Sequence, residues 1–215
     1  GPARDGALPA SAAPQAWPEK LTPRWKVPVG EGHSSPVFAA GRIFVFTREQ
    51  EQEVLRAVEP GSGQVLWRAA YSAPYTMNPA ATRHGKGPKS TPVVSGGRVY
   101  ALGISGILSS FDAATGKLVW RREFGRQFPA TSPLYGAAMS PLVDQGLLIV
   151  HAGGNDSGAL LAMDAASGET RWSWTGDGPG YASPIVAELA GVRQVITETQ
   201  KSIVGVSARS GELLW

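Results

Sequence analysis

Short runs of alternating apolar and polar residues, each closed by a turn sequence, recur along this chain of 215 residues. The clearest run covers residues 110–120, where Leu118 and Trp120 fall on one face of an expected strand and Lys117 and Val119 fall on the other. Similar runs cover residues 57–67, 162–172 and 205–215. Each copy has a glycine, preceded by Ser or Thr, four residues before a tryptophan. These pairs are Gly63 and Trp67, Gly116 and Trp120, Gly168 and Trp172, and Gly211 and Trp215.

The turn residues of the repeat predict a strand, a tight turn and a second strand. Asp112 and Asp164 can accept hydrogen bonds from backbone amides two residues further on. The glycine that follows can adopt the positive φ that closes a hairpin with a bulge. Each repeat therefore places a large indole at the same point of its second strand.

A second pattern, a hydroxyl residue followed by proline, opens a β-rich run in every repeat. It occurs at residues 35–36, 91–92, 140–141 and 183–184. Proline fits the first position of a strand, where its missing N–H does not break a ladder. A short turn and another expected strand follow at residues 42–46, 98–102, 147–151 and 192–197. A third strand then leads into the glycine turn, so the repeating unit has four strands.

Four-stranded units of this length, joined up and down, predict an all-β fold of the β-propeller type with about four blade equivalents. The expected blades are residues 31–71, 88–125, 138–176 and 181–215. Residues 25–30, with Trp25, are expected to form a stray outer strand, and residues 1–24, rich in Ala, Pro and Gly, an extended segment. No window shows apolar residues at helical spacing, so helix is expected to be almost absent.

Two architectures satisfy this count of strands. In the first, residues 25–30 close onto the last set of strands to make a ring of four blades. In the second, the chain is about half of a larger ring. Trp215 favours the second, because the last repeat already carries the start of its own outer strand, and both ends are expected to continue into a longer protein.

The repeat, best seen at residues 112–120, resembles the tryptophan-docking repeat of the PQQ-like β-propellers, and the resemblance covers residues 25–215. It implies a ring of seven or eight blades in which each docking tryptophan packs between neighbouring blades. The family includes quinoprotein alcohol dehydrogenases, which hold pyrroloquinoline quinone and calcium near the ring axis. It also includes a non-enzymatic lipoprotein that assists outer-membrane assembly. The resemblance implies a periplasmic or secreted protein, although no signal peptide is visible in this chain.

Composition narrows the functions further. The net charge is +3, and the basic residues are scattered among carboxylates, so nucleic-acid binding is not expected. No apolar run is long enough to span a membrane. The chain has no cysteine, which excludes disulfides and thiolate metal sites and leaves no counterpart to the adjacent-cysteine ring of the dehydrogenases. Their calcium carboxylates and catalytic aspartate match no position by motif.

The long connections that lead into the inner strands carry the candidate site residues. Residues 83–91 hold His84, Lys86, Lys89 and Thr91 on a glycine-rich loop, which can receive an anion such as a carboxylated quinone or a phosphate. A solvated turn between blades is the alternative interpretation. The equivalent place before the first inner strand holds Glu31 and His33, a pair suited to acid-base chemistry or to an ordinary entry loop.

Later blades place further polar residues at the same point. Ser140 and Tyr181, with Tyr135, Met139 and Ser183, are expected to surround the mouth of the channel together with Thr91. Hydroxyls before proline are also ordinary turn chemistry. Residues 153–158 are polar enough for calcium but lack the spaced carboxylates of a dedicated loop, and a turn explains them equally well.

These features predict a non-catalytic binding or scaffolding propeller that is secreted or belongs to the cell envelope. A protein partner or small ligand is expected at the rim around His33, His84, Lys86, Lys89 and Tyr181. The alternative is a PQQ-dependent dehydrogenase-like oxidoreductase with quinone and calcium. A third hypothesis is self-assembly, in which two chains pair their open blade edges as a homodimer.

Overall fold

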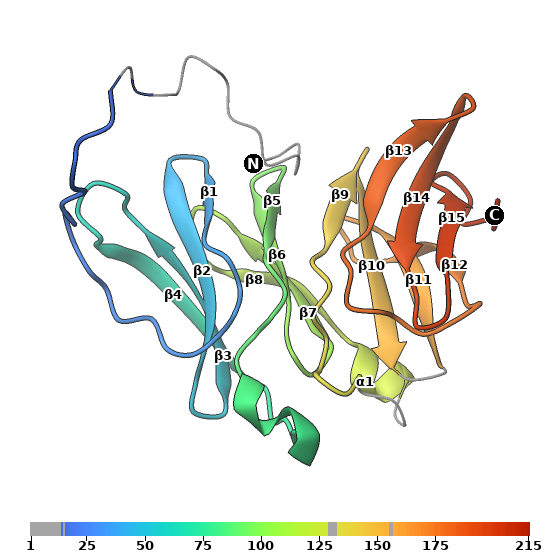
Figure 1. The fold of residues 1–215 in the computed structure, drawn as a ribbon, viewed down its shortest axis with the longest axis horizontal. Coiled ribbons are helices and arrows are strands. Elements are labelled where there is room, and N and C mark those ends of the chain that lie inside the picture. Colours follow the sequence, from blue (N-terminus) through green and yellow to red (C-terminus); the bar gives the residue numbers. More distant parts are fainter. Residues whose placement is uncertain (1–13, 15, 129–132, 155–156) are drawn as a thin grey trace.

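The computed structural model describes residues 14, 16–128, 133–154 and 157–215, and it is a β-propeller built from antiparallel sheets that follow one another along the chain (Figure 1). The first sheet contains β1 (Val37–Ala39), β2 (Arg42–Glu49), β3 (Gln52–Val58) and β4 (Val65–Ser72). The second contains β5 (Val93–Ser95), β6 (Arg98–Leu102), β7 (Ile107–Asp112) and β8 (Leu118–Glu123). The third contains β9 (Leu142–Asp144), β10 (Leu147–Gly154), β11 (Ser157–Asp164) and β12 (Thr170–Trp174). The fourth contains β13 (Ile185–Leu189), β14 (Val192–Glu198) and β15 (Ile203–Ser207).

Each sheet runs in chain order from an inner strand to an outer strand. The inner strands β1, β5 and β9 contact one another in sequence, which brings successive sheets together around a common axis. Within the described residues, helix is confined to the four-residue α1 (Phe124–Gln127) and the 3₁₀ helix η2 (Pro79–His84). Neither is long or apolar enough to cross a membrane.

The predicted outer strand at residues 25–30 is not formed, and this prediction is corrected. These residues are not part of a strand, although Gly30 lies against Arg48 of β2. Pro28 has no N–H to offer to a ladder. The segment is held instead through the Trp25 side chain, whose Nε1 donates to the Pro60 carbonyl oxygen at 2.9 Å.

The last two strands of each four-stranded sheet meet in the predicted bulged hairpin. The pairing register shifts at Ala57/Val58, Ser110/Phe111 and Ala162/Met163. Asp164 accepts hydrogen bonds from the Ala166 and Ser167 amides. The guanidinium of Arg171, which also donates to Asp164, and these amides lower the pKa of Asp164 to about 2. In the first sheet Glu59 replaces the aspartate and accepts the amides of Gly61 and Ser62 in the same way.

The tryptophan of one repeat packs on the glycine turn of the next. A Cβ added to Gly116 would lie 2.5 Å from the Trp67 ring, and Trp67 Nε1 donates to the Ala113 carbonyl oxygen at 3.1 Å. The same arrangement joins Trp25 to Gly63, Trp120 to Gly168 and Trp172 to Gly211. Trp215 differs, because its Nε1 donates to Gln194 Oε1 within its own sheet and the residue is 50% exposed.

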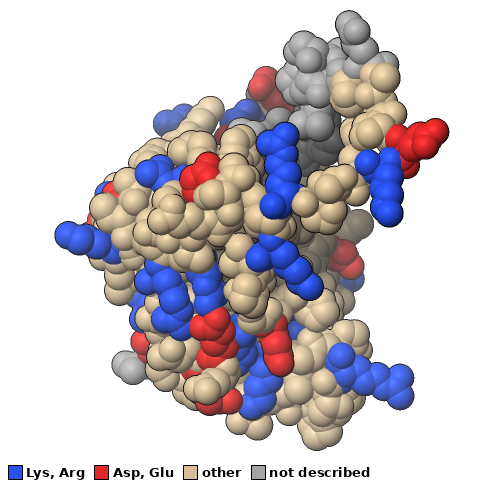
Figure 2. All heavy atoms as spheres, turned by 90° about the vertical axis from the view of Figure 1, so that its left-hand side faces the viewer, with Lys and Arg blue, Asp and Glu red and all other residues tan. Residues whose placement is uncertain are grey.

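The hydrophobic core consists of layers between neighbouring sheets. Phe44 and Phe46 of the first sheet pack with Val99 and Phe111 of the second. Two further layers join the second sheet to the third and the third to the fourth. On the face shown in Figure 2, basic and acidic side chains lie interspersed among uncharged ones. The structure therefore shows no single-signed patch on that face.

Candidate functional site

The long connections between sheets lie on one edge of the propeller, where Figure 1 shows η2 and α1 at the bottom of the view. We call this edge the loop rim and define it as residues 31–35, 73–91, 124–128, 133–140 and 177–184. Its segments are joined by backbone hydrogen bonds, since the His33 and Ser34 amides both donate to the Pro88 carbonyl oxygen. The rim carries the ligand candidates predicted from the sequence, which are His33, His84, Lys86, Lys89, Thr91, Ser140 and Tyr181.

Imidazole and phenol rings follow one another along this rim, and His33 joins them through the backbone of His84. His33 Nε2 lies 3.0 Å from the His84 carbonyl oxygen. The His84 ring packs edge-on against Tyr135, with centroids 4.9 Å apart, and Tyr135 packs edge-on against Tyr181 at 5.6 Å. The Tyr135 amide also donates to Tyr181 Oη at 3.3 Å. We call His33, His84, Tyr135 and Tyr181 the aromatic row, which offers large, partly exposed rings contributed by four successive connections.

The hydroxyl residues before proline are tied to one another around the axis. Thr91 Oγ1 accepts the Ser35 amide at 3.1 Å, and Ser140 Oγ accepts the Thr91 amide at 3.0 Å. Ser183 Oγ accepts the Ser140 amide at 2.9 Å. Each hydroxyl therefore joins its own inner strand to the preceding one. These bonds engage the side chains of Thr91 and Ser140, which the sequence suggested as ligand residues, in holding the sheets together.

The two lysines of the rim point to different partners. Lys86 Nζ lies 3.4 Å from Glu51 Oε1 in the β2–β3 turn. Lys89 Nζ lies 3.5 Å from the Gly85 carbonyl oxygen, and burial lowers the pKa of Lys89. Because one amine is paired with a carboxylate and the other folds back on its own loop, they do not converge on one anion site.

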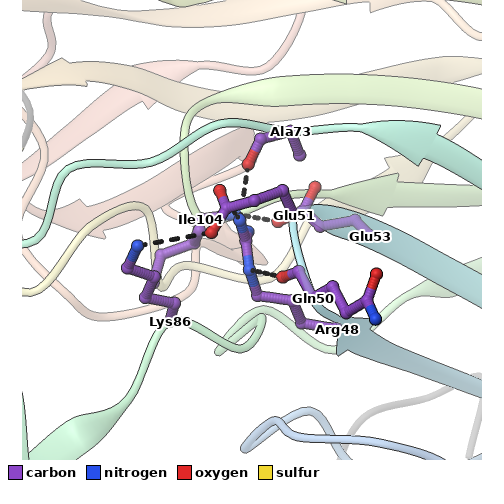
Figure 3. Close-up of polar contacts among 7 residues, drawn as sticks. All are labelled: Arg48, Gln50, Glu51, Glu53, Ala73, Lys86 and Ile104. Atoms are coloured by element: carbon purple, nitrogen blue, oxygen red, sulfur yellow. Dashed lines mark hydrogen bonds and ion pairs between the residues drawn. The ribbon is translucent and has the colours of Figure 1, made fainter.

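A buried arginine organises the turn that receives Lys86. Figure 3 shows Arg48 reaching the Gln50 carbonyl oxygen through Nε at 2.8 Å. Its Nη2 donates to the Ala73 carbonyl oxygen and to Glu51 Oε2, both at 2.9 Å. Since Ala73 follows the first sheet, Arg48 holds the start of the long connection against the β2–β3 turn.

Glu53 is a fully buried carboxylate that sequence reasoning missed. Oε1 accepts the Ile104 amide, and Oε2 accepts the Tyr71 hydroxyl, each at 2.7 Å. Gly103 leaves the room, because a Cβ there would lie 1.8 Å from Glu53 Oε2. Burial raises the pKa of Glu53. The contact ties the first sheet to the β6–β7 turn of the second.

The residues present do not fit a quinone and calcium site. The candidate hydroxyls already accept backbone amides, and the lysines are engaged separately. Among the described residues, no three His, Asp or Glu side chains lie close enough together to hold a metal ion. Asn155 and Asp156 of the polar turn at 153–158 lie outside the described residues. The aromatic row, and not a cofactor site, is the main group of partly exposed side chains on the rim.

Comparison with known proteins gives one matching family. The model of the family described as outer membrane protein assembly factor BamB matches residues 50–215. BamB of Moranella endobia is 33% identical over 141 residues, which is 66% of this chain and 31% of the relative. BamB of Yersinia pestis is 22% identical over 203 residues, which is 89% of this chain and 46% of the relative. The chain therefore spans less than half the length of these relatives.

Solved structures show the same fold in proteins of two kinds. BamB from Moraxella catarrhalis superposes with a TM-score of 0.58 at 18% identity, over 84% of this chain and 50% of the other. Quinohemoprotein alcohol dehydrogenase from Comamonas testosteroni superposes with a TM-score of 0.62 at 19% identity, over 86% of this chain and 34% of the other. At these identities the likeness establishes the fold, and a fold shared by an assembly factor and an enzyme does not decide the function.

Proposed function

This chain belongs to the family of outer membrane protein assembly factor BamB, and from that membership we propose that it is a non-catalytic scaffold of outer membrane protein assembly. Its place of action is then the periplasm. The aromatic row of the loop rim is the surface that contacts the partner, a protein component of the assembly machinery.

The observation that supports the aromatic row as the contact surface is its exposure. Tyr181 is 45% exposed although its ring packs on Tyr135, and His33 and His84 are exposed beside it. Tyrosine is enriched at protein interfaces because it offers a large, rigid contact area with a polar tip. The dehydrogenase alternative is less well supported, because the rim residues do not converge on a quinone or a metal.

Two sheet faces bear on how the ring is completed. Phe38 of β1 is 67% exposed, and Ile203 of β15 is 65% exposed. In a closed propeller such faces are covered by neighbouring blades. We propose that further blades of a larger ring cover these two faces. The alternative is that a second copy of the chain covers them. The mass in solution separates the two, because only the second arrangement makes a dimer.

Complementation of a deletion strain tests the function. Loss of the gene is expected to lower the amount of folded, heat-modifiable β-barrel protein in the outer membrane, and the wild-type gene to restore it. A gene carrying Tyr181→Ala is expected to restore less, whereas Tyr181→Phe, which keeps the ring, restores nearly all.

Trp17→Ala is the matched control, because Trp17 is an exposed aromatic residue outside the rim. Circular dichroism of each purified variant checks that it folds. An unchanged amount of folded barrel protein after deletion would refute the assembly role. Full restoration by Tyr181→Ala would refute the assignment of the contact to the aromatic row.

A further inference from the structure

A small cavity lies between the second and third sheets where they meet the loop rim. Its volume is about 100 Å³. Its apolar wall includes Leu102, Ile104, Phe124 and Met139. Three of these, Leu102, Phe124 and Met139, belong to the buried layer between the two sheets, so the wall is part of the packed core.

Two unpartnered polar atoms belong to residues that line this cavity. His151 of β10 is 2% exposed and its Nδ1 has no hydrogen-bond partner. Ser105, in the β6–β7 turn, has a buried Oγ that also has none. Seven buried side-chain atoms lack a partner among the described residues, and the two residues that carry these atoms line the same cavity. Because a buried polar atom without a partner is costly, the pair indicates a site that is completed by another molecule.

The protonation of His151 defines what that molecule must offer. His151 Nε2 lies 3.0 Å from the Asp177 carbonyl oxygen, which can only accept, so Nε2 carries the hydrogen. Burial lowers the pKa of His151, which keeps the ring neutral near pH 7. Nδ1 is therefore a bare acceptor that requires a donor. The Ser105 hydroxyl can donate or accept.

We propose that this cavity binds the phenol ring of a tyrosine from an extended segment of a protein partner. The phenol hydroxyl donates and accepts, so it matches an acceptor at His151 and a hydroxyl at Ser105. The volume is of the same order as the roughly 150 Å³ engineered cavity that holds one benzene.

A tyrosine side chain, and not a free phenol, is the occupant because so few atoms bind weakly by themselves. A buried aromatic anchor within a larger interface gains from the contacts around it. The cavity borders the loop rim, so the source of the tyrosine rests on the proposed function. The hydrogen-bonding chemistry of the cavity does not depend on the proposed function.

The methionine methyl groups give a direct readout of occupancy. The chain has three methionines. Met139 lines the cavity, and Met77 is the internal control, since it lies in the connection before η2 and is not part of the wall. With isotope-labelled methionine methyl groups, millimolar p-cresol is expected to shift the Met139 signal saturably and to leave Met77 unchanged. Toluene, which lacks the hydroxyl, is expected to bind about fivefold more weakly.

Two variants test whether the His151 and Ser105 side chains cause the preference for p-cresol over toluene. His151→Phe is expected to remove the difference between p-cresol and toluene while both still bind. Ser105→Ala, which barely changes the volume, is expected to reduce the difference and serves if His151→Phe does not fold. An unshifted Met139 signal with both probes, or equal affinity for both in the wild-type protein, would overturn the proposal.

Binding of a short peptide tests whether the phenol ring comes from a polypeptide. The pentapeptide Gly-Gly-Tyr-Gly-Gly is expected to shift Met139 at lower concentration than p-cresol, and the matching peptide with Phe is expected to bind more weakly. Binding of p-cresol without binding of the tyrosine peptide would overturn the assignment to a polypeptide. Failure of both probes leaves the outer-membrane complementation result unaffected, so the two proposals fail separately.

Discussion

Replacing Gly116 with alanine tests whether the packing of tryptophan on glycine holds neighbouring sheets together. Gly116 has φ +72°, and a Cβ there would lie 2.5 Å from the Trp67 ring. An alanine in this backbone conformation costs about 1–2 kcal/mol. The indole must also move, and overpacking of this kind costs about 1–3 kcal/mol. Gly116→Ala is therefore expected to lower the free energy of unfolding by about 2–5 kcal/mol.

Gly97 offers a matched control in the same sheet. Its φ is +74°, and nothing lies within 4 Å of an added Cβ. Gly97→Ala should therefore show only the backbone cost of about 1–2 kcal/mol. Urea denaturation followed by circular dichroism measures both variants. Losses that agree within about 0.5 kcal/mol would refute the steric reasoning.

A double-mutant cycle separates the clash from other effects of the substitution. In a Trp67→Ala background the ring is absent, so Gly116→Ala should cost no more than Gly97→Ala. A cost that stays as large as in the wild-type background would show that the indole is not the obstacle.

Three further variants, one of them a control, test the buried polar contacts. The raised pKa of Glu53 means that the folded protein binds more protons than the unfolded chain above the ordinary value of 4.5, so stability should fall as pH rises through the raised pKa. Glu53→Gln should lack this fall in stability, and urea midpoints of both proteins at about pH 5 and pH 8 measure the difference. Equal pH dependence in both proteins would contradict the raised pKa of Glu53. Ser140→Ala leaves the Thr91 amide without its acceptor and should lower the free energy of unfolding by about 1–2 kcal/mol. Ser90→Ala, which removes a buried hydroxyl that has no partner, should lower it little in the same urea titration. Equal losses would count against the hydrogen bonds between the hydroxyl residues.

The fold was predictable because its determinants are local. A few adjacent residues determine each turn, such as the aspartate, the hydroxyl residue and the glycine at 112–116. The strands β2, β6, β10 and β14 begin at the residues where the sequence predicts them. The exception is the segment at 25–30, whose sequence suits a strand but which forms none in the structure.

The buried polar contacts were not predictable, because they join residues far apart in sequence. In the sequence Glu53 ends a polar run that includes Gln50 and Gln52, so it is indistinguishable from a solvent-facing residue until Ile104 is placed against it. The sequence likewise predicts only an ordinary strand at His151. The sequence did group His84, Tyr135 and Tyr181 on one rim, but their edge-on packing depends on the course of connections that carry no periodic signal.

The direction of the tryptophan contacts bears on how such a chain can lengthen during evolution. Every complete repeat carries a glycine turn that receives the preceding indole and an indole that the following turn receives. A tandem duplication of one repeat would therefore insert a part that already fits both of its new neighbours, without any compensating substitution at either junction. Rings with different numbers of blades are then reachable by single genetic events, whereas loss of half a repeat would leave one indole without its turn.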